Sequence, residues 1–242
     1  MQVPKIYCLS LTCAEGRRSR MNDRFKFHDL RHEFVDAVDR DSDLVSELIK
    51  GYHDITFKSR SECACMQTHL KGIRRFIESG EEFGIMSEDD ILPHNNFKER
   101  FFHHFENFPK DSNILMLGYF IEYWIGFEWS GENKSLQNLC RINPTHTWGA
   151  FCYLITRNYA IQVIKMFEGK KWVQMRGFLT SEMITRFSGG HICYPILVIE
   201  EAIDSHIRGK DELKLHEKVF GPWKYCNFSA AEKEHLSPLK DY

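Results

Sequence analysis

The chain has 242 residues, of which 43% are apolar and 27% are charged, a composition that favours one large hydrophobic core. Lys and Arg total 32 against 34 for Asp and Glu, and this formal net charge of -2 argues against a binder of nucleic acid or another polyanion. The longest apolar runs, such as Ile192–Ile199, fall far short of the ~20 residues that a transmembrane helix needs.

The N-terminal segment and the cysteines bear on the compartment in which the chain works. The first residues show neither a basic beginning nor a long apolar stretch, so no secretory signal is expected. The eight cysteines include no CxxC pair, and we expect them to be reduced thiols. These features predict a monomer or weak dimer that works in the cytoplasm or at the inner face of a membrane.

Strand-like and helix-like segments alternate along the first half of the chain. Buried strands are predicted at Lys5–Leu11, His32–Val38 and Phe83–Met86. A polar, arginine-rich helix is predicted from about Glu15 to Phe27. A second helix is predicted to begin at an N-cap, Ser61, and to end at Gly80.

The same alternation continues in the second half. The predicted elements there are a phenylalanine-rich helix at Phe97–Phe105, strands at Ile114–Tyr119 and Phe151–Thr156, a helix at Tyr159–Phe167 and a last strand at Ile192–Ile199. Strands that alternate with helices from one end to the other predict an α/β fold, with a mixed central sheet flanked by helices. No linker or internal repeat divides the chain, so a single domain over residues 1–242 is predicted.

Three adjacent carboxylates, Glu88, Asp89 and Asp90, follow the predicted strand Phe83–Met86. Their mutual repulsion favours a bound cation or the uptake of a proton. In an extended segment residues 88 and 90 would face the same side and could hold one Mn²⁺ or Mg²⁺ ion. The alternative is a solvated acidic turn.

Other sequence motifs narrow the chemistry further. The chain has no GxxxxGK[ST], GxGxxG, GxSxG or HExxH, so kinase, dinucleotide oxidoreductase, serine hydrolase and zincin readings lose their support. Cys65 and His69 stand one helical turn apart, which would suit a metal, but cysteine is among the most buried residue types and a core role is favoured.

Seven segments in a fixed order carry a family resemblance. They read IYCLSL, EGRRSRM, EFVDAVD, ECACMQTHLKGIRRFIESG, FGIMSEDDI, ILMLGY and GAFCYLITRNYAIQVI. This order resembles the family 25 glycosyltransferases, which include lipooligosaccharide and collagen galactosyltransferases, from about Ile6 to Phe167. The resemblance implies a GT-A type, Rossmann-like domain, a UDP-sugar donor and a divalent metal, Mn²⁺ or Mg²⁺.

The resemblance also implies roles for individual residues. Glu88 and Asp90 would hold the metal, with His206 as a third ligand, and Asp89 would lie beside the donor sugar or ribose. The remaining donor-binding positions would be Leu9, Ser10, Leu11, Arg17, Arg20, Asp36, Ala37 and His69. A solvated helix face is the alternative for the two arginines, a core histidine for His69 and a surface histidine for His206.

Two positions depart from the family pattern. Phe151 stands where the family has a histidine, so any role of that histidine is lost. Ser181 stands where the family has an aspartate, and Glu182 supplies a carboxylate one residue later. Glu182 is the candidate for the general base that an inverting transfer requires.

The sequence supports three functions to different degrees. The first is a metal-dependent inverting glycosyltransferase that moves a hexose, with galactose expected, from a UDP-sugar to a hydroxyl of a glycan or protein. The second, suggested by Phe151 and Ser181, is an inactive family member that binds a nucleotide sugar or a partner protein. The third is a metal-dependent phosphohydrolase or nucleotidyltransferase, which needs a second acidic or histidine cluster that the sequence does not locate.

Overall fold

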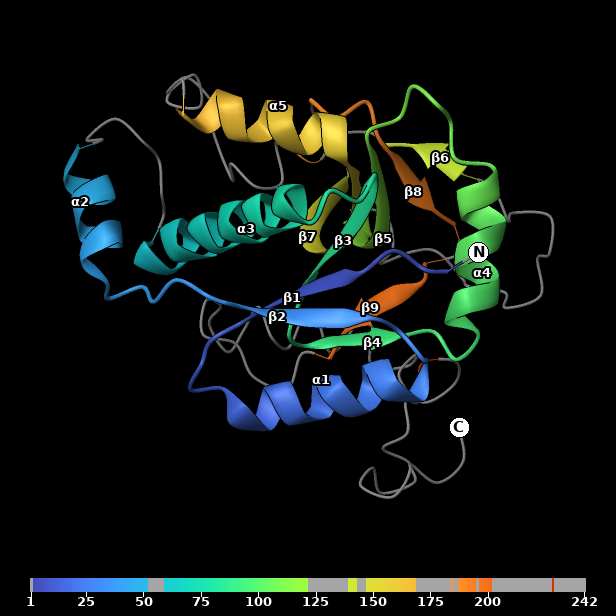
Figure 1. Ribbon diagram of the computed structural model, residues 1–242, viewed down its shortest axis with the longest axis horizontal. Helices are drawn as coiled ribbons and strands as arrows, with labels where there is room; N and C mark the ends of the chain where they lie inside the picture. Colours follow the sequence, from blue (N-terminus) through green and yellow to red (C-terminus); the bar gives the residue numbers. More distant parts are fainter. Residues whose placement is uncertain are drawn as a thin grey trace.

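The computed structural model describes residues 2–51, 59–121, 139–142, 147–168, 184, 187–194, 196–201 and 228. Within them the strands form a seven-stranded sheet in the order β2-β1-β3-β7-β5-β8-β6 and a two-stranded sheet of β4 and β9 (Figure 1). The strands are β1 (Ile6–Ser10), β2 (His32–Asp36), β3 (Phe83–Glu88), β4 (Ile91–Pro93), β5 (Ile114–Ile121), β6 (Leu139–Arg141), β7 (Thr147–Thr156), β8 (His191–Cys193) and β9 (Val198–Glu200). The helices are α1 (Glu15–Phe27), α2 (Asp43–Gly51), α3 (Arg60–Ser79), α4 (Phe97–Glu106) and α5 (Arg157–Glu168).

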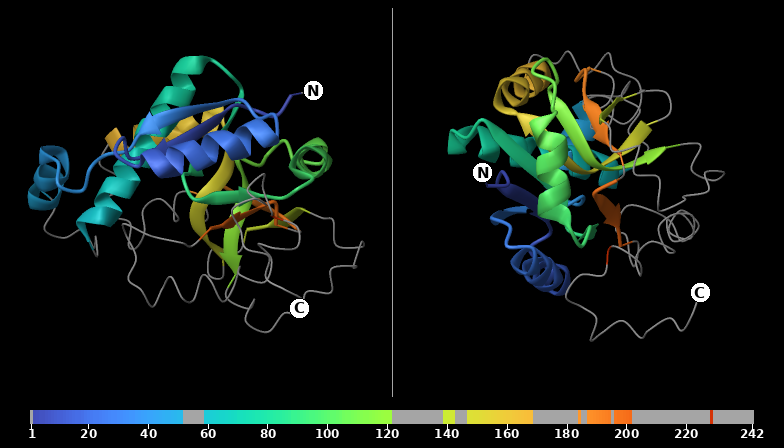
Figure 2. Two further views of the ribbon diagram at one scale, coloured as in Figure 1. Left: turned by 90° about the horizontal axis from the view of Figure 1, so that it is seen from below. Right: turned by 90° about the vertical axis from the view of Figure 1, so that its right-hand side faces the viewer.

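The first half of the chain builds a parallel three-stranded unit. Strand β1 pairs in parallel with β2 on one side and with β3 on the other. Helix α1 connects β1 to β2, and α3 precedes β3; Figure 2 shows these two helices on opposite sides of the strands. Because both sides of these strands are covered, β1 is buried along its whole length.

The second half adds antiparallel strands, which makes the sheet mixed as predicted. Strand β7 pairs antiparallel with both β3 and β5, and β8 pairs in parallel with β5. Helix α5 packs beside α3 on the same face of the sheet (Figure 1). The predicted α/β class with flanking helices is therefore confirmed, whereas the single domain over residues 1–242 stays a prediction.

The predicted strand Ile192–Ile199 is wrong as one element. It is two strands that belong to different sheets, since β8 pairs with β5 and β9 pairs antiparallel with β4. Between them Leu197 N donates a hydrogen bond to Leu117 O, and the chain changes sheet. The proline at position 195 has no N–H group to offer a continuous ladder.

Helix α3 begins two residues earlier than the sequence indicated. Its N-cap is Ser59, whose hydroxyl accepts a hydrogen bond from Glu62 N at 3.2 Å. The predicted cap, Ser61, lies inside the first turn instead. Gly80 ends the helix as expected, with a φ of 78° that a residue with a Cβ rarely adopts.

Elements α2, β4 and β6 were not anticipated, because they are short, with nine residues in α2 and three in each of the two strands. The phenylalanine-rich helix is α4, in which Phe101 stacks with Phe97 and Phe105. No helix within the described ranges combines the length and the apolar character needed to cross a membrane.

Candidate functional site

A cavity of about 300 Å³ lies at the carboxyl ends of the parallel strands. Strand β1 has β2 and β3 on opposite sides, so the strand order changes direction at β1. Doubly wound sheets open a ligand-binding crevice at such a switch point. Of the predicted site residues, those that line this cavity are Leu9, Ser10, Leu11, Arg17, Ala37, His69, Glu88, Asp89 and Asp90.

The three adjacent carboxylates are not one extended segment, and that prediction is wrong. Glu88 is the last residue of β3, whereas Asp89 and Asp90 lie in the turn before β4. The chain turns there because β4 pairs with β9 rather than continuing the large sheet. All three carboxylates nevertheless line the cavity.

Asp89 is tied to the end of β1 and to helix α1. Its Oδ2 accepts a hydrogen bond from Ser10 Oγ at 2.7 Å, and its Oδ1 accepts one from Arg17 Nη1 at 2.8 Å. Both carboxylate oxygens are thus engaged by neighbours. This arrangement holds the Arg17 guanidinium at the cavity wall.

Asp90 is a buried carboxylate with other carboxylates near it. Burial raises its pKa well above the ordinary value, and the nearby carboxylates of Glu200, Glu88 and Asp89 raise it further, while Arg17 acts in the opposite direction. Asp90 Oδ1 is buried and accepts no hydrogen bond from the residues that the structure describes.

A divalent cation would offset the repulsion between Asp90 and the neighbouring carboxylates, and it would give Asp90 Oδ1 a partner. Mn²⁺ and Mg²⁺ prefer carboxylate oxygens, and their charge would favour the ionised form of Asp90. The acidic residues that line the cavity therefore suit such an ion, which Glu88 and Asp90 would hold.

Arg17 and Arg20 lie on the same helix but have different surroundings. Arg17 Nη1 lies 3.7 Å from Asp90 Oδ2 in addition to its bond with Asp89. Arg20 does not line the cavity, and its Nε lies 3.6 Å from Glu201 Oε2. The structure therefore brings Arg17, but not Arg20, to the predicted donor site.

Asp36 also lies outside the cavity wall, although it ends β2 next to Ala37. Its Oδ1 accepts a hydrogen bond from Arg18 Nη2 at 2.6 Å, and 55% of its side chain is exposed. Arg18 Nη2 also donates to the carbonyl of Ser10 at 2.9 Å. Arg18, which the sequence did not single out, thus joins the ends of β1 and β2.

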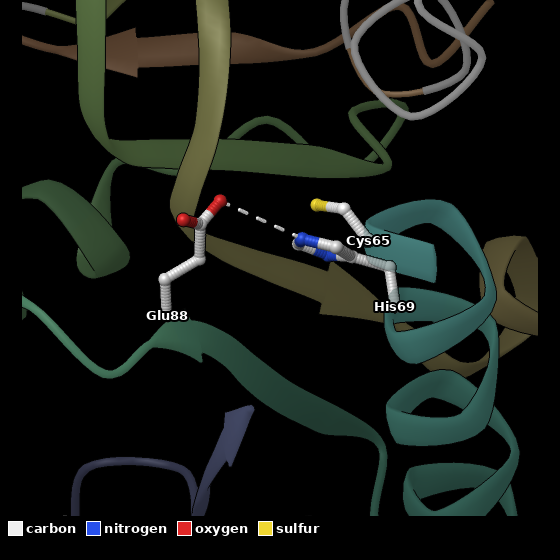
Figure 3. A group of neighbouring side chains, drawn as sticks. All are labelled: Cys65, His69 and Glu88. Carbon is white, nitrogen blue, oxygen red and sulfur yellow. Dashed lines mark ion pairs between the residues drawn. The ribbon is translucent and has the colours of Figure 1, made fainter. Parts of the chain in front are cut away.

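Helix α3 carries His69 into the cavity because Gly72 lets the helix approach β1. A Cβ at residue 72 would lie 2.7 Å from Leu9 Cδ2, so the Leu9 side chain would have to shift to admit it. His69 is 2% exposed, and its Nδ1 is hydrogen-bonded to Tyr153 Oη at 3.1 Å. Its Nε2 lies 3.8 Å from Glu88 Oε1, and Figure 3 shows this pair beside Cys65.

Two predicted site residues fall outside the described part of the chain, and one position that departs from the family pattern lies within it. Glu182 and His206 lie outside the described residues. Phe151, which replaces a histidine of the family, is buried and packs edge-on against Phe120 at 5.5 Å between ring centroids. Glu200 is a neighbour of Asp90 that sequence reasoning missed, because 110 residues separate them and no local pattern marks it.

The fold and the cavity define a doubly wound α/β protein with an acid-edged binding site at its strand switch. A family model described as Glycosyltransferase family 25 (LPS biosynthesis protein) matches residues 3–179, most of the chain. The chain therefore belongs to glycosyltransferase family 25, and its broad class is that of a glycosyltransferase. Comparison with curated proteins yields no match.

Solved structures resemble the chain only loosely. Apo mouse xyloside xylosyltransferase 1 is 12% identical, with 76% of this chain and 67% of that chain covered and a TM-score of 0.37. The inositol-1-phosphate CTP transferase from T. maritima is also 12% identical, with 91% and 97% covered and a TM-score of 0.36.

Proposed function

We propose that the protein is a metal-dependent, inverting hexosyltransferase, which moves galactose from UDP-galactose to a hydroxyl group of a glycan or protein. The observation that carries the proposal is the acidic turn at the strand switch. There Asp90 is buried among carboxylates with one oxygen unpartnered in the described structure, and Arg17 stands at the same cavity wall.

Glu88 and Asp90 are the residues that would hold the metal. When bound, Mn²⁺ would act as a Lewis acid that stabilises the negative charge developing on the leaving nucleotide diphosphate. Arg17 faces the same cavity and would add a fixed positive charge at the diphosphate. Asp89 keeps this guanidinium in place through its 2.8 Å hydrogen bond.

The end of β1 would bind the nucleotide. Leu9, Ser10 and Leu11 line the cavity at the carboxyl end of this strand, and Ala37 lines it from the end of β2. A wall that combines the apolar side chains of Leu9, Leu11 and Ala37 with the hydroxyl of Ser10 suits a flat base and ribose. Contacts of this kind would position the nucleotide of the donor, but they carry no information about the acceptor.

A base must take the proton of the acceptor hydroxyl as it attacks the anomeric carbon. Glu182 is our candidate. The Glu182→Gln variant should lower turnover about a hundredfold or more and leave donor affinity nearly intact. Wild-type transfer rates in this variant would assign the base elsewhere.

The direct test is calorimetric titration of the purified chain with UDP in the presence of Mn²⁺. Asp90→Ala should abolish the Mn²⁺-dependent binding while circular dichroism shows a folded protein. Asp36→Asn, which removes an exposed carboxylate at the end of β2, is the matched control. UDP affinity that is unchanged in Asp90→Ala and insensitive to EDTA would sink the proposal.

The inactive alternative makes a different prediction in a panel of nucleotide sugars with Mn²⁺. An enzyme should hydrolyse its preferred donor slowly even without an acceptor, whereas an inactive member should bind a donor and leave it intact. We favour the enzyme, because Glu88, Asp89 and Asp90 are all present in the acidic turn.

We also propose that the protein works in the cytoplasm, on soluble intermediates or at the inner face of a membrane, as a monomer or weak dimer. Cys8, Cys152 and Cys193 are buried thiols. Mass spectrometry of the native protein should find the cysteines reduced. Several intramolecular disulfides would contradict this location.

A further inference from the structure

Three side chains with metal-binding atoms meet at the wall of the cavity. Cys65 and His69 lie four residues apart on α3 and therefore share one side of the helix, and Glu88 reaches them from the end of β3. A sulfur, a nitrogen and an oxygen from these residues lie within 4.8 Å of one another. Figure 3 shows these three side chains close together, and no other three such residues come together in this way in the part of the chain that the structure describes.

The histidine supplies the second observation. Its residue is 2% exposed, yet Nε2 has no hydrogen-bond partner in the described structure and points at the carboxylate of Glu88, 3.8 Å away. Tyr153 Oη holds the opposite nitrogen, Nδ1, at 3.1 Å. With the proton on Nδ1, Nε2 carries its free lone pair on the side of Glu88. A hydrogen bond on the far nitrogen is how proteins orient histidine ligands.

We infer that Cys65, His69 and Glu88 form a zinc site at the edge of the donor cavity. A thiolate and an imidazole are the ligands that select zinc over Mn²⁺ or Mg²⁺, which prefer oxygen. Zinc–ligand distances imply that neighbouring ligand atoms stand about 3.4–3.7 Å apart in a tetrahedral site, so small side-chain rotations suffice. The cavity leaves room for water as the fourth ligand.

Glu88 is a ligand in both of the proposed metal sites. It completes the zinc site with Cys65 and His69, and it stands beside Asp90, whose pKa it raises. Zinc would therefore withdraw Glu88 from the metal of the donor site and reduce donor binding. This consequence, unlike the zinc site itself, rests on the function proposed above.

Cobalt reports the site directly, because Co²⁺ replaces zinc and a thiolate ligand gives it a charge-transfer absorption in the near ultraviolet. The full-length, reduced protein is titrated with Co²⁺ after treatment with chelator. We expect this band to saturate at one equivalent and to vanish on addition of Zn²⁺. Its absence in the wild-type protein would overturn the inference.

Cysteine variants identify the thiolate. Cys65→Ser should lose the cobalt band, and Cys13→Ser should keep it, although Cys13 is an exposed cysteine that lines the same cavity. A band that persists in Cys65→Ser would overturn the site. Circular dichroism in EDTA checks that each variant is folded.

Affinities for Zn²⁺, measured by competition with a chromophoric chelator, test the other two ligands. Loss of even an outer hydrogen bond to a ligand typically costs 10–100-fold in metal affinity. Glu88→Gln should therefore lower zinc affinity at least about tenfold and keep the cobalt–thiolate band, and Tyr153→Phe should lower it about tenfold. Unchanged zinc affinity in Glu88→Gln would remove Glu88 from the site and overturn the inference.

The link to donor binding is tested separately. Calorimetric titration with UDP in Mn²⁺ is repeated with one equivalent of Zn²⁺, which should lower UDP affinity in the wild-type protein but not in Cys65→Ser. If the protein binds no UDP with any metal, the proposed function fails while the cobalt spectrum still decides the zinc site. If UDP binds and zinc has no effect, the two sites do not share Glu88.

Discussion

Arg17 and Arg24 lie two turns apart on helix α1, and each meets acidic residues, but in opposite settings. Arg24 is fully buried, and its two terminal nitrogens donate to Glu201 at 2.6 and 3.2 Å. Arg24 Nη1 also donates to the carbonyl of Ile91 at 3.0 Å. Arg17 stands at the cavity wall with 11% of its side chain exposed, where it faces Asp89 and Asp90.

The surroundings of Arg24 and Arg17 differ in the ratio of arginines to carboxylates. At the buried end, Arg24 and Arg20 both lie against one carboxylate, Glu201. At the cavity, Arg17 serves both Asp89 and Asp90, and the pKa of Asp90 is raised. At the buried end two arginines meet one carboxylate, so that cluster does not attract a further cation. At the cavity two carboxylates share one arginine, and the excess negative charge favours a bound cation.

The largest effect should come from breaking the buried pair. Arg24→Met should lower the free energy of unfolding by about 3–5 kcal/mol, because Glu201 is left as a buried charge without its main partner. Urea denaturation measures this loss. The double variant Arg24→Met/Glu201→Leu should recover most of it, and a single-variant loss below about 1 kcal/mol would contradict the contrast.

Acid should weaken the same end of the molecule. Burial lowers the pKa of His28 and His94 to about 4, with Lys98 and Arg100 adding to the effect. Since the ordinary histidine pKa is about 6.5, the unfolded chain binds these protons first, and stability is lost as pH falls from 6.5 to 4. After solvent screening we expect about 1–2 kcal/mol from each histidine.

Thermal unfolding at a series of pH values measures this loss. His28→Asn should unfold with a smaller dependence on pH between 6.5 and 4 than the wild-type protein, because one of the groups that must be protonated is gone. An identical pH profile in this variant would show that the burial of His28 does not control the response.

The cavity arginine should affect binding more than folding. Arg17→Gln should lower UDP affinity in Mn²⁺ about a hundredfold, or ~2.7 kcal/mol, near the upper end of the loss expected for charge-assisted hydrogen bonds, and lower stability by only about 1 kcal/mol. Calorimetry and urea denaturation measure the two quantities. Arg75→Gln, which removes an exposed arginine away from the cavity, is the control that should leave UDP affinity unchanged. If the variant lost more free energy of unfolding than free energy of UDP binding, Arg17 would have a structural role like that of Arg24, and the contrast would fail.

The smallest effect is expected at the exposed end of β2. Asp36→Asn should lower stability by less than about 1 kcal/mol, since its ion pair with Arg18 is in contact with solvent. Donor affinity should stay within about twofold of wild type by calorimetry. A strong loss of affinity would restore the sequence-based assignment of Asp36 to the donor site.

Local patterns predicted the elements of the parallel half well. The apolar run at β1, the polar helix α1 and the stop of α3 at Gly80 follow from residue types within a few positions. The place of the acidic residues at the carboxyl end of β3 followed in the same way. Leu9–Leu11, Glu88 and Asp90 line the cavity, and the donor- and metal-binding roles that the family resemblance implies for them stay predictions.

The sequence could not decide which side of α1 would face the cavity. Arg17 and Arg20 look alike in sequence, but three residues along a helix change the direction of a side chain, and only the packing of α1 on the sheet shows which one meets Asp89. The sequence likewise placed Cys65 and His69 on one face of a helix but could not show that Glu88 lies opposite them. The three residues come together only in the folded structure.

The sequence by itself determined the α/β alternation, the family and the acidic edge of the site, because each depends on short-range patterns. Tertiary structure alone decided that β8 and β9 part into two sheets and that β9 brings Glu200 to Asp90 and Glu201 to Arg24. Those contacts join residues 110 and 177 positions apart. They arise from strand pairing, which depends on the register of the whole sheet rather than on the preferences of neighbouring residues.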